Sequence, residues 1–205
     1  MIEIGKKNLL YGGRYAGKTY QAIKFLADRA VNYREDSYFF RSESAVLKFK
    51  AYEYSCNILT DKDINHLGTF NNIKREICFE NGCKIYFDAI EGINKDNHLY
   101  KFKEVSNVLI DEAEQVKYLD LVFILKNFKS QTIIATANQF TSNLEDFTFN
   151  LFDAKKRMTI EDNPSANEYD YKIIESIISF DLKIYLNQRF GLTAKEINNI
   201  FKNIK

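Results

Sequence analysis

The chain has 205 residues, a net charge of +1, and 45% hydrophobic and 28% charged residues. These values are ordinary for a globular chain, and the length favours one domain with a substantial core. The balanced charge gives no global case for a nucleic-acid or membrane surface. The start lacks the apolar region of a signal peptide, and no window approaches the roughly 18 apolar residues of a membrane span. Three cysteines without a C-x-x-C pair argue against structural zinc and favour reduced thiols in the cytoplasm.

The first chemical motif is Gly-Gly-Arg-Tyr-Ala-Gly-Lys-Thr at residues 12–19, which fits the phosphate-binding pattern G-x-x-x-x-G-K-[ST]. An apolar run at 8–11 precedes it, and a helical pattern over 18–32 follows it. Glycines let the backbone approach a phosphate, and the positive end of a helix favours the anion. Lys18 supplies a charge for the outer phosphates, and Thr19 supplies a hydroxyl ligand for Mg²⁺. The alternative is a glycine-rich turn with a solvated lysine. The residues predicted to bind the nucleotide here are Gly12, Gly13, Arg14, Tyr15, Ala16, Gly17, Lys18 and Thr19.

The next segments predict a strand at 38–41 and an amphipathic helix at 42–54. Arg41 ends the strand, where ligands gather in open α/β sheets, so it is either a site-facing residue or an ordinary surface arginine. Residues 57–72 have mixed polarity and no clear period.

An antiparallel hairpin is predicted at about 73–89. Apolar residues alternate with polar ones from Ile73 to Phe79 and again from Cys83 to Phe87, and Asn81-Gly82 lies between the two runs. An Asn-Gly pair in this position favours a type I′ turn. Residues 92–102 then have the polar character of a loop.

The second chemical motif is the apolar run 107–110 followed by Asp111 and Glu112. A buried parallel strand that ends in two acids places carboxylates at the ligand edge of the sheet, as in a Walker B motif. Asp111 would bind Mg²⁺, directly or through water, and Glu112 would polarise the attacking water. A glutamate directly after the aspartate favours ATPases that carry their catalytic base on this strand.

A helix at 116–128 and a buried strand at 132–136 follow. Thr136 and Asn138, at the end of that strand, are candidates for sensing the γ-phosphate or its water. Capping of a following helix is the alternative role for both. A further strand is predicted at 157–160 and a helix at 171–186 that Gly191 terminates. The run Thr193-Ala194-Lys195-Glu196 is a capping box that opens a last amphipathic helix.

These motifs together resemble the ATPases that package DNA into tailed-phage capsids, the large terminase subunits. The loop at 12–19 is similar to their arginine-bearing Walker A motif, the hairpin at 77–87 to the segment before their Walker B motif, and 108–114 to its Asp-Glu-Ala-Glu ending. The segment 134–138 occupies the place of their coupling motif but departs from its commoner form. The resemblance covers about residues 7–140. It implies an α/β P-loop fold of the additional-strand, catalytic-glutamate class, with a mainly parallel sheet flanked by helices.

The resemblance also implies an activity and roles for residues. ATP and Mg²⁺ would bind, with Lys18 and Thr19 on the phosphates and Thr19 and Asp111 on the metal. Glu112 and Lys18 would act in catalysis, Arg14 would sense the γ-phosphate or act as a cis arginine finger, and Asn138 would couple hydrolysis to movement. Partners would be double-stranded DNA, a portal and procapsid, and further copies of the chain in a ring, in the host cytoplasm. Candidates for a cation acting in trans are Lys101, Lys103, Lys126 and Lys129, and candidates for DNA contact are Lys48, Lys50, Lys95, Lys101 and Lys103.

The expected organisation is one ATPase domain over 1–205, with a core at about 7–162 and a helical C-terminal tail at about 165–205. The chain ends too early for a terminase nuclease domain, so it is either an ATPase domain of a longer protein or one of the smaller packaging ATPases. The alternatives in function are a small-molecule kinase, which would need an arginine-rich lid where only Arg157 and Arg189 occur, and a nucleotide-binding scaffold that does not hydrolyse.

Overall fold

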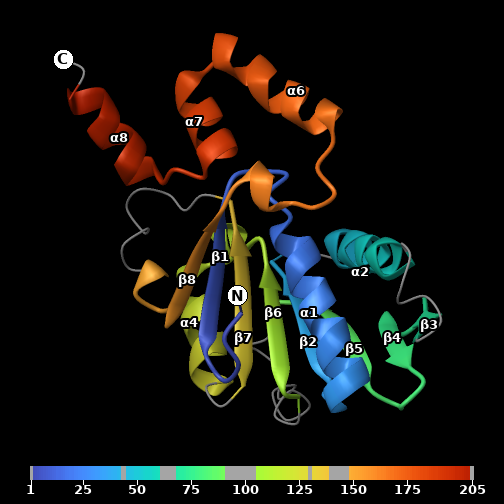
Figure 1. The fold of residues 1–205 in the computed structure, drawn as a ribbon. Helices are drawn as coiled ribbons and strands as arrows, with labels where there is room; N and C mark the ends of the chain where they lie inside the picture. Colours follow the sequence, from blue (N-terminus) through green and yellow to red (C-terminus); the bar gives the residue numbers. More distant parts are fainter. Residues whose placement is uncertain are drawn as a thin grey trace.

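The computed structural model describes residues 2–42, 45–60, 68–90, 105–128, 131–138 and 148–203. A sheet of eight strands in the order β3-β4-β5-β2-β6-β7-β1-β8 forms its centre (Figure 1). The strands are β1 (Lys7–Gly12), β2 (Ser37–Arg41), β3 (Gly68–Asn71), β4 (Glu76–Phe79), β5 (Lys84–Ala89), β6 (Asn107–Asp111), β7 (Thr132–Ala137) and β8 (Ala154–Met158). All neighbours from β5 to β8 pair in parallel, whereas β3, β4 and β5 pair antiparallel. This confirms the predicted α/β fold with a mainly parallel sheet.

The helices cover both faces of the sheet. The α-helices are α1 (Lys18–Tyr33), α2 (Ala45–Thr60), α4 (Tyr118–Asn127), α6 (Glu168–Ser176), α7 (Leu182–Phe190) and α8 (Ala194–Asn203). Short 3₁₀ helices are η2 (Ala113–Gln115), η3 (Ile160–Asp162) and η4 (Ile177–Ser179). Within the described ranges, no helix is long and apolar enough to cross a membrane.

Alternation along the strands divides the core into two layers. Leu9, Phe40 and Val108 point to one face, where Leu121 and Ile124 of α4 pack against them. Their strand neighbours Leu10, Phe39 and Leu109 point to the other face, against Ile23 and Leu26 of α1 and Tyr52 and Leu59 of α2. Every residue of β6 and β7 is buried, as expected for strands covered on both sides. The central strands β6 and β7 are thus packed on both faces, and their carboxyl ends lie at one edge of the sheet.

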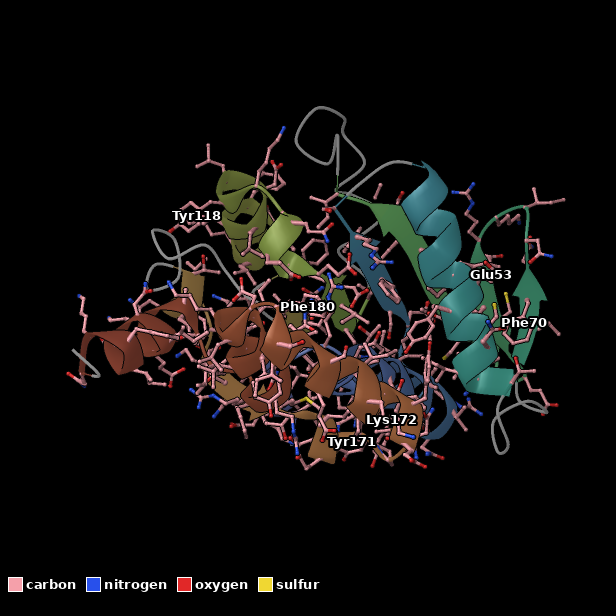
Figure 2. The ribbon with its side chains drawn as sticks, turned by 90° about the horizontal axis from the view of Figure 1, so that it is seen from above. Glu53, Phe70, Tyr118, Tyr171, Lys172 and Phe180 are labelled. Carbon is pink, nitrogen blue, oxygen red and sulfur yellow. The ribbon has the colours of Figure 1, made fainter. Side chains whose placement is uncertain are left out.

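That edge is where the predicted motifs meet. β7 lies between β1, which leads into the phosphate loop, and β6, which carries the Walker B acids. The additional strand expected from the family resemblance is therefore present. Helices α6, α7 and α8 lie beyond the same edge of the sheet (Figure 1). Seen from above, α8 and α2 with its labelled residue Glu53 lie on opposite sides of the molecule, and Tyr171 and Lys172 of α6 lie between them (Figure 2).

The hairpin is present, but its turn differs from the prediction. The strands pair Cys78 with Lys84, and the amide of Gly82 donates to the carbonyl of Phe79 at 2.9 Å. The positive φ falls at Gly82 (87°) and not at Asn81, so the loop has three residues with a G1-type glycine and is not a type I′ turn. The Asn81 side chain explains the difference, because its Nδ2 donates to the carbonyls of Ala30 (2.7 Å) and Val31 (3.2 Å) at the end of α1.

Several predicted boundaries were also wrong. The hairpin begins at Glu76 and not at Ile73, which lies 95% exposed in a turn, and the unpredicted strand β3 pairs with β4. Helix α2 continues to Thr60, and β8 spans 154–158 instead of 157–160. The helix predicted at 171–186 is two helices, because the Asp181 side chain caps the first turn of α7. The capping box at the start of α8 and the end of α7 at Gly191 are confirmed.

Candidate functional site

The phosphate loop has the backbone that anion binding requires. Gly12 has φ 135°, Tyr15 has φ 60°, and Gly17, with φ 74°, is the N-cap of α1. No described side chain caps this helix terminus, so its first amide groups remain available to an anion. The loop opens into a pocket of about 690 Å³. All the loop residues from Arg14 to Thr19 line this pocket, and Gly12 and Gly13 are not among its lining residues.

Lys18 is 7% exposed, and its ammonium group donates hydrogen bonds to acceptors of the protein itself. Its Nζ donates to the carbonyl oxygens of Gly12 (3.2 Å) and Gly13 and to Oδ1 of Asn138 (3.1 Å). Burial lowers the pKa of Lys18 to about 8, while the negative charges of Glu114 and Asp111 oppose that shift. The ammonium group is therefore aimed into the loop and pre-positioned beside the place where phosphates would bind.

Asp111 and Thr19 meet across the edge of the sheet, as predicted. The Thr19 hydroxyl donates to Oδ1 of Asp111 at 2.7 Å, and the Thr136 hydroxyl donates to the same oxygen at 2.6 Å. Burial raises the pKa of Asp111, and the hydrogen bonds from Thr136 and Thr19, with the charge of Arg41, oppose that rise. A carboxylate and a hydroxyl are hard oxygen ligands of the type that Mg²⁺ binds together with phosphate oxygens. These residues fit such a metal.

Glu112 follows Asp111 and lies in a left-handed backbone conformation, with φ 54°. Its amide donates to the Thr136 hydroxyl at 3.1 Å, which helps to hold this uncommon conformation. Its carboxylate forms an ion pair with Arg41, whose Nε lies 3.1 Å from Oε2 of Glu112 and 3.7 Å from Oδ2 of Asp111. Arg41 is therefore a site residue and not an ordinary surface arginine.

The Thr136 and Asn138 side chains contact charged and backbone groups of the pocket within the described part of the chain. The Thr136 hydroxyl connects the two Walker B acids, and it is 2% exposed. The Asn138 side chain lies between Lys18 and Glu114, and its Nδ2 donates to Oε1 of Glu114 at 2.7 Å. Glu114 is the residue that sequence reasoning missed. Its only signal was its place in the Asp-Glu-Ala-Glu run, since its contact with Asn138 depends on how β6 and β7 pair.

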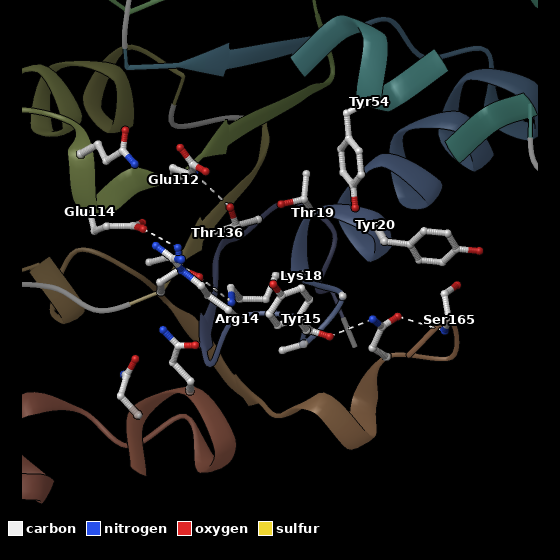
Figure 3. Close-up of a pocket in the computed structure, with 18 of the residues that line it drawn as sticks. Arg14, Tyr15, Lys18, Thr19, Tyr20, Tyr54, Glu112, Glu114, Thr136 and Ser165 are labelled. Carbon is white, nitrogen blue, oxygen red and sulfur yellow. Dashed lines mark hydrogen bonds between the residues drawn. The ribbon is translucent and has the colours of Figure 1, made fainter. Parts of the chain in front are cut away.

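The pocket extends to both sides of the loop. Figure 3 shows Glu112, Glu114 and Thr136 on one side of Lys18 and Thr19, and Tyr20 and Ser165 on the other. Arg14 lines the pocket, is exposed, and makes no ion pair with any residue that the structure describes. Lys126 is exposed near the end of α4. The other candidate cations, Lys101, Lys103 and Lys129 for action in trans and Lys48, Lys50, Lys95, Lys101 and Lys103 for DNA, lie outside the described side chains.

The C-terminal segment packs directly on the phosphate loop. A Cβ added to Gly13 would lie 1.9 Å from the carbonyl oxygen of Gln188 in α7, so only glycine fits this close approach. The Asn163 side chain donates to the carbonyl oxygen of Tyr15 at 2.8 Å. Arg157 pairs with Glu196, and Arg189 pairs with Glu161. Both arginines thus join the core to the C-terminal helices, which argues against a phosphate-covering lid built on them.

Comparison with known proteins identifies the family. The family model described as phage terminase large subunit matches residues 5–198. A search of curated proteins by sequence found no match. Among solved structures, the large terminase of a thermophilic bacteriophage, in complex with ATP-gamma-S, aligns with a TM-score of 0.61 and 13% identity, over 91% of this chain and 47% of that one. This chain thus spans about half the length of that terminase.

Two further structures align over nearly their whole length. The N-terminal domain of the DNA packaging ATPase from bacteriophage phi29 aligns with a TM-score of 0.58 and 16% identity, over 79% of this chain and 94% of that one. The large terminase ATPase domain of Thermus phage P74-26 aligns with a TM-score of 0.58 and 8% identity, over 90% and 87%. At such identities the structural likeness establishes the fold, and the family match, which extends over nearly the whole chain, establishes the kinship. The chain belongs to the phage terminase large subunit family.

Proposed function

We propose that the chain is the ATP-hydrolysing domain of a viral motor that moves double-stranded DNA into a procapsid. The observation that carries this proposal is the Thr19–Asp111 hydrogen bond of 2.7 Å, which joins the two nucleotide motifs at one edge of the sheet. Lys18 and Glu112 line the same pocket. The family match supports the motor context.

In this proposal the phosphates of ATP lie along the loop at 13–19, against the amide groups at the start of α1. The Lys18 ammonium group, which donates to the carbonyl oxygens of Gly12 and Gly13 in the structure, donates to phosphate oxygens instead. Thr19 and Asp111 hold Mg²⁺. When bound, the metal would offset the charge that develops on the β- and γ-phosphate oxygens.

Glu112 is the group that orients the attacking water. The water oxygen forms a bond to the γ-phosphorus, the bond from that phosphorus to the β–γ bridging oxygen breaks, and the carboxylate accepts the water proton. In the structure Arg41 pairs with this carboxylate. Glu112 must therefore leave or share that ion pair before it can act on water, which ties hydrolysis to a rearrangement at the end of β2.

The transition state also needs a cation near the γ-phosphate. Arg14 lines the pocket and has no carboxylate partner among the described residues, so it suits this role within its own subunit. A neighbouring copy in a ring could supply a second cation. Loss of an arginine finger costs about 10³- to 10⁵-fold in rate, so an isolated copy is expected to hydrolyse ATP slowly. We place 1–205 as one ATPase domain that works with a portal in the host cytoplasm.

The test is single-turnover phosphate release by the wild type and by Lys18→Ala and Glu112→Gln. Lys18→Ala is expected to lose ATP binding, because the phosphates lose their main cation. Glu112→Gln is expected to keep ATP binding and to lose hydrolysis by at least about 100-fold, the lower range for a general base. Exposed residues provide matched controls, Lys24→Ala on the same helix and Glu80→Gln in the hairpin loop. Turnover retained in both site variants would overturn the site assignment.

A second measurement separates the motor from a kinase. Linear double-stranded DNA is expected to change ATP turnover, whereas nucleosides and nucleoside monophosphates are not expected to accept the phosphate. A phosphorylated small acceptor as product, instead of free phosphate, would favour the kinase. A requirement for Mg²⁺ is tested in the same assay by chelation and by adding the metal back.

A further inference from the structure

Glu114 is a carboxylate that the nucleotide motifs leave without a role. It lies in η2, directly after the Walker B strand, and lines the pocket. Its Oε1 accepts a hydrogen bond from Nδ2 of Asn138 at 2.7 Å, and its Oε2 is buried without a hydrogen-bond partner in the described part of the chain. Burial raises the pKa of Glu114, and hydrogen bonds from its own backbone amide and from Asn138 oppose that rise. Keeping a buried carboxylate beside a phosphate site is costly and requires an explanation.

The explanation lies in the polarity of the Asn138 amide. An amide accepts through its oxygen and donates through its nitrogen, whereas a carboxylate only accepts and an ammonium only donates. Between Glu114 and Lys18 the amide has one compatible orientation, with Nδ2 toward Glu114 and Oδ1 toward Lys18 (3.1 Å). Glu114 therefore fixes which end of Asn138 faces Lys18, across the boundary between β6 and β7.

The same orientation distributes the remaining donors. One N–H of Lys18 is satisfied by Asn138, and the others now reach the carbonyl oxygens of Gly12 and Gly13. The Asn138 amide has two N–H groups, of which Glu114 takes one. The second has no acceptor among the described residues, and Asn138 lines the pocket together with Glu112 and Thr136. A flipped amide would instead face its N–H groups toward the ammonium and repel it.

We propose that Glu114 is a positioning residue for ATP hydrolysis, an inference that rests on the function proposed above. Glu114 holds Asn138 so that Oδ1 anchors the Lys18 ammonium beside the place of the γ-phosphate. Glu114 itself does not touch the nucleotide. Its effect therefore falls on the reaction of ATP more than on the binding of ADP, which lacks the γ-phosphate.

An exchange of donor and acceptor tests this arrangement. Asn138→Asp places two carboxylates face to face, and the loss in kcat/KM for ATP is expected to be about 100-fold or more, which is about 3 kcal/mol. Glu114→Gln alone keeps an acceptor for Asn138 and is expected to cost less, about three- to tenfold. The double variant combines Glu114→Gln with Asn138→Asp and has the wild-type net charge. Its glutamine amide donates to the new carboxylate, which also accepts from Lys18. The kcat/KM of the double variant for ATP is expected to be at least about tenfold higher than that of Asn138→Asp alone.

The measurements are kcat, KM, the Kd values of ADP and ATP-γ-S, and the urea unfolding midpoint of each variant, with Glu80→Gln as control. Rescue in kcat and in ATP-γ-S affinity, with ADP affinity within about threefold of wild type, supports the proposal. A double variant as poor as Asn138→Asp, or losses that follow the unfolding midpoint, overturn it. If neither the wild type nor any variant hydrolyses ATP, the proposed hydrolytic function fails. If the double variant nevertheless regains the ATP-γ-S affinity that Asn138→Asp loses, the positioning of Lys18 by Glu114 and Asn138 stands. If the wild type binds neither nucleotide, both fail.

Discussion

Thr136 is the residue whose replacement tests the geometry of the Walker B acids most directly. Its hydroxyl donates to Oδ1 of Asp111 at 2.6 Å and accepts from the amide of Glu112 at 3.1 Å. Thr136→Val keeps the shape of the side chain and removes both hydrogen bonds. Asp111 keeps its hydrogen bond from Thr19, whereas the Glu112 amide loses its partner.

The expected cost follows from these two bonds. A hydrogen bond to a charged group contributes about 1.5–3 kcal/mol, and a buried donor left without a partner costs about 1–3 kcal/mol. Valine recovers a part of this by burying a methyl group in place of the hydroxyl. We therefore expect a loss of about 3 kcal/mol in the free energy of unfolding. For a domain of this size that loss lowers the Tm by about 6–12 °C.

The assay is urea and thermal unfolding followed by far-UV circular dichroism, together with phosphate release. Thr136→Ser is the matched control, because it keeps the hydroxyl and loses one methyl group at a cost of about 1 kcal/mol. The Val variant is also expected to lose kcat by about 100-fold, since Glu112 loses the bond that fixes its left-handed backbone. The reasoning is refuted if Thr136→Val is within about 0.5 kcal/mol of wild type, a change typical of neutral surface sites. Equal losses in the Val and Ser variants would refute it as well.

Two further predictions concern the phosphate loop. Gly13→Ala is expected to destabilise the protein by about 2–4 kcal/mol, because the new Cβ would lie 1.9 Å from the carbonyl oxygen of Gln188 and displace α7. Gly5→Ala, at a positive φ but in open space, is the comparison, and an equal or larger loss there would contradict the proposed clash. Burial lowers the pKa of Lys18 to about 8, and bound phosphates favour the protonated form, so ADP binding is expected to take up a proton. The affinity for ADP, measured by calorimetry with a chelator present, should therefore fall as pH rises from about 8 to 10, by up to about tenfold per pH unit. A constant affinity over that range, or an affinity that rises, would contradict the role of the Lys18 charge.

The nucleotide motifs could be predicted from the sequence because their chemistry is local. The proposed binding by residues 12–19 depends on their own backbone and on the helix that follows them, and Asp111 ends a strand whose apolar run is continuous. Their meeting also follows from general topology, since the carboxyl ends of parallel strands share an edge. The prediction needed no knowledge of the strand order.

Features that depend on strand order or on distant partners could not be predicted in this way. Arg41 pairs with Glu112 because β2 lies beside β6, and the sequence alone left its role open. The hairpin loop depends on Asn81 contacting the end of α1, some 50 residues earlier in the chain. By contrast, the start of α7 carried a local signal that was overlooked. Asp181 is a favoured N-cap residue directly before an apolar position.

The polar groups that the proposed ATP chemistry needs are bonded to one another or to the loop backbone in the structure. Lys18 contacts loop carbonyls and Asn138, Glu112 contacts Arg41, and Asp111 accepts from Thr19. Binding ATP must exchange these contacts for contacts to phosphates, so the affinity is a difference between two well-bonded states. Under the proposed mechanism Glu112 must leave or share its ion pair with Arg41 before it acts on water, and this step adds to the barrier of hydrolysis.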